Sequence, residues 1–432
     1  MWSIALGVAW LGGFFCLAAL GLEPVATFFF CFAWVGLIYT FDRLIARSEG
    51  RSLIARLGAA PFACLVLWSA VNWFLYELAN LRLHNWHYVL VTDHDIARCV
   101  GTVLAFGTVL PGVFWIDHWL GTQGVLTSVR VRPVRITTAR LMGLQLTGLV
   151  FLALCLTDPE HFYLLIWGVT ALVLAPISYR CGIDGWLRQW QRGEIGPTLR
   201  MLLAGGMAGG FWEFFNFWAR ARWIYTVPGF DEWKLFEMPL LGFVGFPPFA
   251  LECACAYRLL VWYRLAPAFG ALTQRGPARG PLTFVVAITI AMLISVSGYV
   301  AVDRVIVTSR TPRVADVLPL TGNQQAALAS AGVTHLTQLV GWGSAGTWKD
   351  LQAILKPDEE GSLARITALY LHQGIGTTYG NRLAAAGITS LSQLQDRTVE
   401  ELWQTLQQTE APGRTPTRAQ IKVWLRRLPT EE

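Results

Sequence analysis

Charged residues are scarce in this sequence. Asp, Glu, Lys and Arg make up 14% of the 432 residues, whereas hydrophobic residues make up 54%. Soluble globular domains carry about 25% charged residues. This shortage excludes a soluble protein for most of the chain and predicts that the chain lies in a membrane.

Several catalytic motifs are also absent. The sequence has no Walker phosphate-binding loop, no GxSxG, no HExxH and no Rossmann glycine pattern, and it identifies no cofactor. The eight cysteines form no CxxC pair, so we expect buried free thiols. His84, His87 and His94 lie close together, but the second half of the chain has no histidine at matching places. We therefore expect no metal site.

Nine apolar segments are long enough to cross a bilayer. They are residues 3–21, 24–42, 55–80, 96–118, 138–157, 161–179, 200–220, 238–262 and 282–302. The composition changes after the ninth segment. From Arg313 onward basic and acidic residues are equal in number, so the net charge of +6 lies entirely in the preceding part.

The first eight segments contain a duplication. Glu77 and Asn80 recur about 136 residues later as Glu213 and Asn216. A Trp-x-Tyr pattern and a segment with Gly, Pro and an acidic residue follow in both copies. These matching residues are Trp86 and Trp223, Tyr88 and Tyr225, Gly107 and Gly242, Pro111 and Pro247, and Asp117 and Glu252. Two four-span repeats have the same orientation, so we expect a shared site at the interface between them.

These patterns predict an all-α fold. We expect a polytopic membrane helix bundle of about nine spans, built as a duplicated 4+4 repeat, with a C-terminal soluble domain. The predicted divisions are residues 1–135 (first membrane repeat), 136–265 (second membrane repeat), 280–303 (ninth span), 304–315 (linker) and 316–432 (soluble domain).

Arginines lie mostly on one side of the predicted spans. The loops after segments two, four, six and eight carry Arg43, Arg47, Arg51, Arg56, Arg130, Arg132, Arg135, Arg140, Arg180, Arg188, Arg192, Arg200, Arg258, Arg264, Arg275 and Arg279. The positive-inside rule places these loops and the N-terminus in the cytoplasm. We therefore expect a multi-pass protein of a bacterial inner (plasma) membrane, with an odd span count placing the C-terminal domain in the periplasm.

The C-terminal part has its own repeat. Leu328, Gly332, Thr334, Leu336, Gln338 and Leu339 recur 55 residues later as Leu383, Gly387, Thr389, Leu391, Gln393 and Leu394. This pattern, with Gly374-Ile375-Gly376 before the second copy, resembles the tandem helix-hairpin-helix domain filed as domain of unknown function 4332. The resemblance implies Gly-x-Gly turns whose backbone N–H groups can hold a nucleic-acid phosphate.

Two features disfavour nucleic acid as the partner of this domain. The first copy has Leu320-Thr321-Gly322 in place of Gly-x-Gly, and the domain is net neutral. Sequence-independent DNA binding needs a basic surface that neutralises phosphates. We therefore expect residues 316–432 to dock a protein partner.

Glu77 and Glu213 are the strongest candidates for chemistry. An ionisable group at the bilayer centre costs about 2.5 kcal/mol or more, so it usually marks a function. A protonated glutamate there can act as a general acid. Alternatively, each carboxyl lies near the outer interface and binds its asparagine and a tryptophan N–H, fixing the helix register. In either case Asn80 and Asn216 are expected to orient the carboxyls.

Trp86, Tyr88, Trp223 and Tyr225 follow helix ends, where aromatic belts anchor proteins at the interface. Their repeated spacing also fits a lid over a lipophilic pocket. Glu252 follows a helix start interrupted by proline, and such breaks are tolerated where they line a cavity. We assign these residues, with the two asparagines, to a candidate pocket for membrane lipid or pigment.

The second repeat also distantly resembles the lycopene cyclase domain family. The residues that carry the likeness are Glu213, Trp223, Tyr225, Gly245, Pro247 and Glu252, whereas the family's PxEE pair is absent. The resemblance implies a polyene substrate and carboxyl groups that protonate it and guide cyclisation.

Three functions follow from these patterns. The first is an integral membrane subunit or scaffold that binds lipid or pigment and docks a partner through its outer domain. The second is a membrane enzyme on a lipophilic isoprenoid or carotenoid, with Glu77 and Glu213 as acid groups. The third, a transporter with the carboxyls as a proton relay, is least favoured because the polar groups cluster near one face.

Overall fold

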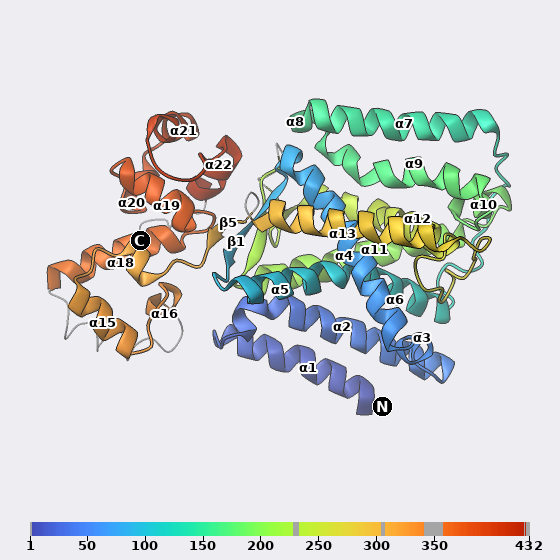
Figure 1. Ribbon diagram of the computed structural model, residues 1–432, viewed down its shortest axis with the longest axis horizontal. Helices are drawn as coiled ribbons and strands as arrows, with labels where there is room; N and C mark the ends of the chain where they lie inside the picture. Colours follow the sequence, from blue (N-terminus) through green and yellow to red (C-terminus); the bar gives the residue numbers. More distant parts are fainter. Residues whose placement is uncertain (1, 228–232, 304–306, 341–356, 427, 429–432) are drawn as a thin grey trace.

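The computed structural model describes residues 2–227, 233–303, 307–340, 357–426 and 428. The chain is mostly helical. Long helices lie side by side in one bundle, and a cluster of shorter helices lies beyond one end of it, with short strands between the two parts (Figure 1).

The first half of the bundle contains three long helices, a strand and a broken fourth helix. These elements are α1 (Trp2–Ala19), α2 (Val25–Glu49), α3 (Leu53–Leu57), α4 (Ala59–Leu83), β1 (Trp86–Val91), α5 (Asp95–Gly107) and α6 (Val109–Thr122). The break between α5 and α6 has a local cause. Pro111 has no N–H for the carbonyl one turn earlier, and the Ser69 hydroxyl bridges the Phe106 carbonyl and the Leu110 N–H.

The second half repeats this order of elements. It comprises α7 (Thr138–Thr157), α8 (Pro159–Phe162), η1 (Tyr163–Leu165), α9 (Ile166–Arg180), α10 (Trp186–Gln191), α11 (Gly196–Trp218), β2 (Arg222–Tyr225), β3 (Lys234–Leu235), β4 (Met238–Pro239), η2 (Leu240–Gly245) and α12 (Phe246–Trp262). Helix α11 packs against α2, α6 and α12, so it joins the two halves. Gly205 and Gly209 on α11 lie directly against Phe246, which lets α11 and α12 approach closely.

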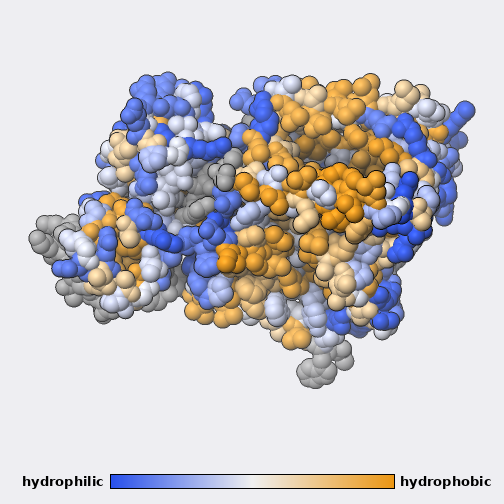
Figure 2. Space-filling model, viewed as in Figure 1, coloured by the Kyte–Doolittle hydropathy of each residue, from blue (hydrophilic) through white to orange (hydrophobic). Residues whose placement is uncertain are grey.

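Seven helical stretches among the described residues are long and apolar enough to cross a membrane. They contain α2, α4, α5–α6, α7, α8–α9, η2–α12 and α13 (Pro281–Ala301). The predicted segments at 3–21 and 200–220 form helices too, but these are not in that set. Large apolar side chains such as Leu146 on α7 and Met292 on α13 are exposed. Figure 2 shows this apolar surface over the bundle, with hydrophilic residues at both ends.

A three-stranded sheet caps one end of the bundle. Strand β1 pairs antiparallel with β2 and parallel with β5 (Val307–Arg310). The sequence predicted loops at the two Trp-x-Tyr sites, and this prediction was wrong because both sites form strands. The segment predicted as a linker, residues 304–315, contains β5, and its residues 304–306 lie outside the described residues. Aromatic and β-branched residues favour strands once a pairing partner is available. Here the partners come from segments far apart in the sequence.

The C-terminal part is a cluster of short helices with its own apolar core. They are α14 (Val314–Val317), α15 (Gly322–Ser330), α16 (Thr337–Val340), α18 (Pro357–Leu371), α19 (Gly376–Ala385), α20 (Ser392–Gln395), α21 (Val399–Gln408) and α22 (Arg418–Arg426). The sequence repeat has a matching local structure. Gly332 and Gly387 both have positive φ, and the side chains of Gln338 and Gln393 accept the Thr334 and Thr389 N–H groups.

Candidate site between the two halves

Glu77 is held by three aromatic side chains. It lies on α4 with 0% of its surface exposed. Its Oε1 accepts hydrogen bonds from Trp73 Nε1 (2.9 Å), Trp86 Nε1 (3.1 Å) and the Tyr88 hydroxyl (2.6 Å). Its Oε2 is buried and has no hydrogen-bond partner among the described residues. All the donors therefore reach one oxygen of this carboxyl group.

Glu213 has the same arrangement in the second half. It lies on α11 and is also fully buried. Its Oε1 accepts the Tyr225 hydroxyl at 2.7 Å, and that hydroxyl oxygen accepts Trp223 Nε1 at 2.9 Å. Its Oε2 likewise has no partner in the described part of the chain. The tryptophan N–H contact that the sequence predicted for these carboxyls is direct at Glu77 and passes through the tyrosine at Glu213.

The asparagines bind strand backbone. Asn80 Nδ2 donates to the Trp86 carbonyl (2.8 Å), and its Oδ1 accepts the Asn85 N–H (2.8 Å). Asn216 Nδ2 donates to the Trp223 carbonyl (2.9 Å), and its Oδ1 accepts the Trp223 N–H (3.0 Å). The prediction that these residues orient the carboxyls directly was wrong. They orient the strands, and the strands carry the aromatic side chains to the carboxyls.

The register of β1 and β2 is symmetric. Trp86 pairs with Tyr225, Tyr88 pairs with Trp223, and His87 pairs with Ile224 between them. Each tryptophan of one copy therefore lies opposite the tyrosine of the other, as expected for two copies related by a twofold axis through the centre of the pair. This observation places the two Trp-x-Tyr patterns in one site.

The ionisable groups on the strands are perturbed by burial. Burial, followed by the neighbouring glutamate, raises the pKa of the Tyr88 and Tyr225 hydroxyls well above the usual value. Burial, followed by the charges of Lys234 and His84, lowers the pKa of His87 to about 3. The hydroxyls are therefore neutral hydrogen-bond donors and the imidazole is neutral at physiological pH.

An aromatic cavity of about 50 Å³ lies between the halves. Its walls come from both copies, and they are Phe30, Trp73, Trp86, Tyr88, Ala105, Phe106, Trp167, Trp212, Trp223, Tyr225, Met238, Gly242, Gly245, Phe246 and Phe249. A second cavity of about 80 Å³ shares Phe30, Tyr88, Ala105, Phe106 and Trp223 with the first. The four predicted strand aromatics thus line the cavity. Glu77 binds the polar ends of Trp86 and Tyr88, and Glu213 binds the Tyr225 hydroxyl, which in turn accepts from Trp223.

Glu252 supports a different part of the wall. It is fully buried on α12. Its Oε2 accepts the Tyr76 hydroxyl at 2.6 Å, and its Oε1 accepts the Thr170 N–H at 2.8 Å. Tyr76 packs on Trp167 and on Phe249, which both line the cavity. Both carboxyl oxygens are occupied, so Glu252 positions the wall.

Three tryptophans of the cavity were missed in the sequence. Trp73 binds Glu77 directly, and Trp73 and Trp212 lie 5.0 Å apart between ring centroids. Trp73 stands one helical turn before Glu77, which puts both on one face of α4. That spacing was the available signal. Trp167 had no such signal, because its place follows from the packing of α9 against α12.

The C-terminal domain covers the outer face of the sheet. Ile224 of β2 is buried in a cluster with Val89 of β1 and Val423 of α22. Ile224 also lies beside the turn at Gly374. Gln373 Nε2 donates to the buried Glu237 Oε1 at 3.2 Å. The Gly-x-Gly turn that the resemblance associates with phosphate therefore faces this chain's own bundle.

The described residues contain no group of three or more His, Cys, Asp or Glu side chains that could hold a metal ion. Comparison with protein families, with curated proteins and with solved structures finds no match to this chain. The geometry of the cavity is therefore the basis for the function proposed below.

Proposed function

We propose that this membrane protein binds a lipophilic isoprenoid or polyene in the aromatic cavity between its two halves and acts on it through Glu77 and Glu213 as acid groups. The proposal rests on one observation, which is that the two oxygens of each carboxyl group have different surroundings, in the same way in both copies. In each, one oxygen is held by the aromatic side chains of the cavity wall, and the other is buried without a partner in the described chain.

A buried polar atom without a partner costs about 1–3 kcal/mol, so it requires an explanation. The same unpaired oxygen occurs in two independent copies of the motif. A carboxylic acid whose carbonyl oxygen accepts all the neighbouring donors keeps its O–H for a group that the chain does not supply. A carbon–carbon double bond of a ligand is such a group, because it accepts a proton.

The cavity wall suits the intermediate that such a proton transfer creates. Aromatic faces attract cations within about 6 Å of the ring centroid, and most of the lining side chains are aromatic. The polar groups of these side chains already have partners, because Trp73, Trp86 and Tyr88 donate to Glu77, Tyr225 donates to Glu213, and Trp223 donates to Tyr225.

The proposed step balances without an oxidant. One glutamic acid gives its proton to one carbon of a double bond, the π electron pair forms the new C–H bond, and the adjacent carbon becomes cationic. Loss of a proton from a neighbouring carbon to a carboxylate, with or without prior ring closure, restores a double bond and the acid. The outcome is an isomerised or cyclised hydrocarbon of unchanged composition.

The test compares Glu77→Gln and Glu213→Gln, singly and together, with the exposed control Glu160→Gln. Lipid extracts of expressing cells and of the purified protein are analysed by chromatography and mass spectrometry. We expect the double variant to fold and retain ligand while the isomeric product disappears, and the control to behave as the wild type. Unchanged product in the double variant would show that the carboxyls are not acid groups.

The predicted scaffold function depends on the C-terminal domain, which would dock the partner protein. The contacts of this domain that the structure describes are with its own bundle, so docking of a protein partner by residues 316–432 stays a prediction. We further propose nine spans in a bacterial inner membrane, with the N-terminus in the cytoplasm and this domain in the periplasm. An alkaline phosphatase fused to the C-terminus is expected to be active, and an inactive fusion of normal abundance would invert this topology.

A further inference from the structure

A second cavity lies at the end of the bundle far from the sheet. It has a volume of about 150 Å³ and lies among α6, α9, α10, α11, α12 and the loop that follows α12. Along α11, Arg200 at this cavity is 13 residues from Glu213, which corresponds to about 20 Å. The cavity is therefore separate from the aromatic cavity and plays no part in the function proposed above.

The lining of this cavity is positively charged. Among the described residues, three arginines (Arg188, Arg200 and Arg258) and one carboxylate (Asp117) line it, with no lysine and no other acidic residue. Arg200 Nε donates to Asp117 Oδ1 at 2.9 Å, which balances one of the three charges. Arg258 donates to the Asp184 carbonyl and Arg188 Nη2 to the Tyr179 carbonyl, both of which are uncharged. Two positive charges are thus left without a carboxylate in the lining.

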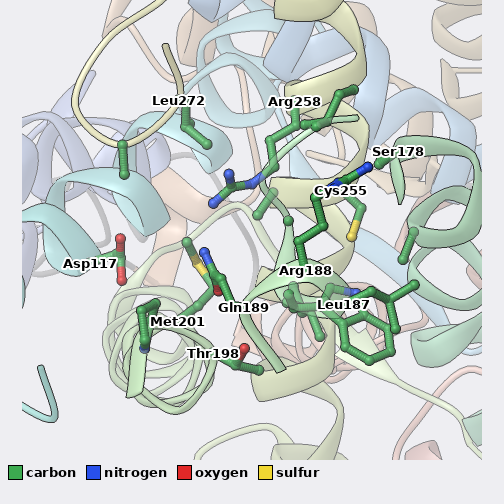
Figure 3. A pocket seen from close by; sticks show the side chains of 18 of the residues that line it. Asp117, Ser178, Leu187, Arg188, Gln189, Thr198, Met201, Cys255, Arg258 and Leu272 are labelled. Atoms are coloured by element: carbon green, nitrogen blue, oxygen red, sulfur yellow. The ribbon is translucent and has the colours of Figure 1, made fainter. Parts of the chain in front are cut away.

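The cavity also contains unused donors. Ser178 is 3% exposed, and its hydroxyl has no hydrogen-bond partner among the described residues. Arg188 Nε is buried and has no partner in the same part of the chain. In Figure 3 Arg258 and Asp117 extend into the cavity from different helices, with Gln189 and Thr198 on another side. Ser178, Arg188 and Arg258 come from α9, α10 and α12, and all three line this one cavity.

We propose that this cavity binds a phosphate-type anion through Arg188, Arg258 and Ser178. A half-buried guanidinium and a buried hydroxyl both gain when they donate to an anionic oxygen, and arginine matches phosphate geometry with two parallel N–H groups. The excess of two positive charges suits a phosphate monoester, free phosphate or a phospholipid head group. Asp117 holds Arg200 at the edge of the site and leaves the other two arginines for the ligand.

The test uses the full chain purified in maltoside detergent. Thermal unfolding is followed while inorganic phosphate or dihexanoyl phosphatidic acid is titrated, with dihexanoylglycerol as the uncharged control. We expect saturable stabilisation by at least one phosphate ligand and none by dihexanoylglycerol. Equal affinity for the two phosphates would identify free phosphate as sufficient, whereas at least tenfold tighter binding of phosphatidic acid would identify a lipid head group.

Variants separate this site from general charge effects. Arg258→Gln is expected to raise the apparent Kd for the phosphate ligand at least tenfold, because a charge-assisted hydrogen bond is lost. Arg132→Gln removes the same charge from an exposed position outside the cavity and should leave the Kd within twofold. If Arg258→Gln fails to accumulate, Ser178→Ala replaces it as the site variant, because it removes only a single hydroxyl. Absence of saturation, or equal losses in Arg132→Gln and the site variants, would overturn the proposal.

Discussion

The asparagines that hold the strands provide the sharpest test of how the site is built. Asn216→Ala removes the only side chain that pairs both the N–H and the carbonyl of Trp223 in the described chain. Trp223 is buried, and each buried backbone group left unpaired costs about 1–3 kcal/mol. We therefore expect the free energy of unfolding to fall by about 2 to 6 kcal/mol. Asn80→Ala should have a similar effect, because Asn80 makes the equivalent bonds to Asn85 and Trp86.

The measurement is unfolding by titration with sodium dodecyl sulfate in mixed micelles, followed by tryptophan fluorescence. The matched control is Asn72→Ala on the same helix as Asn80, because among the described residues Asn72 donates only to the sulfur of Cys253, at 3.8 Å. Thioether and thiol sulfurs are weak acceptors, so this variant should lose about 1 kcal/mol or less. If Asn80→Ala and Asn216→Ala differ from Asn72→Ala by less than 1 kcal/mol, the asparagines do not hold the strands.

Three further predictions concern pH, helix packing and the C-terminal domain. Because the pKa of His87 is lowered to about 3 by burial and then by Lys234 and His84, only the unfolded chain binds its proton below about pH 6.5. Stability should fall by about 1.4 kcal/mol for each pH unit below that value, and His87→Leu should remove this slope. Gly209→Ala should cost about 1–3 kcal/mol, because a Cβ there would lie 2.2 Å from the Phe246 ring. Arg382→Met should destabilise the C-terminal domain by about 3 kcal/mol or more, because its guanidinium donates to four backbone carbonyls.

Each of these three has its own check. Thermal unfolding between pH 7 and 5 reports on His87, and a slope that survives in His87→Leu would assign the titration to another group. Gly210→Ala is the control for Gly209→Ala, since a Cβ at 210 meets nothing within 4 Å; equal losses would contradict the packing argument. Limited proteolysis of the C-terminal domain reports on Arg382, with the exposed Arg397→Met as control. Equal protection of both variants would show that the carbonyl contacts contribute little.

The sequence predicted the helices of the bundle because long apolar runs have one stable form in a bilayer. It also predicted the duplicated motif, since Glu77, Asn80 and the Trp-x-Tyr pattern recur at one spacing. The strands were missed for a physical reason. A run of four to six residues becomes a strand only when another segment pairs with it, and the partners of Tyr88 are Trp223 and Val307, which are far away in the sequence.

It was easier to predict which residues belong to the site than to predict what each of them binds. Asn80 lies one turn from Glu77, so its proximity suggested that it binds the carboxyl. Instead, both polar groups of the Asn80 amide bind backbone groups of Asn85 and Trp86, where the chain leaves the helix and enters the strand. The second cavity was missed because Arg188, Arg200 and Arg258 were interpreted only as markers of the cytoplasmic side. Between Gly182 and Pro197 the chain folds into α10 and turns, and residues of this segment line the cavity.

We propose that the aromatic cavity holds a lipophilic unsaturated ligand. The most direct measurement is mass spectrometry of small molecules extracted from the protein purified in mild detergent, with Ala105→Leu beside the wild type. Ala105 lines both neighbouring cavities, and three added carbons would fill the space. We expect a stoichiometric isoprenoid or polyene in the wild type and in the exposed control Ala60→Leu, and its loss in Ala105→Leu. The same ligand content in all three proteins, or no such ligand in the wild type, would contradict it.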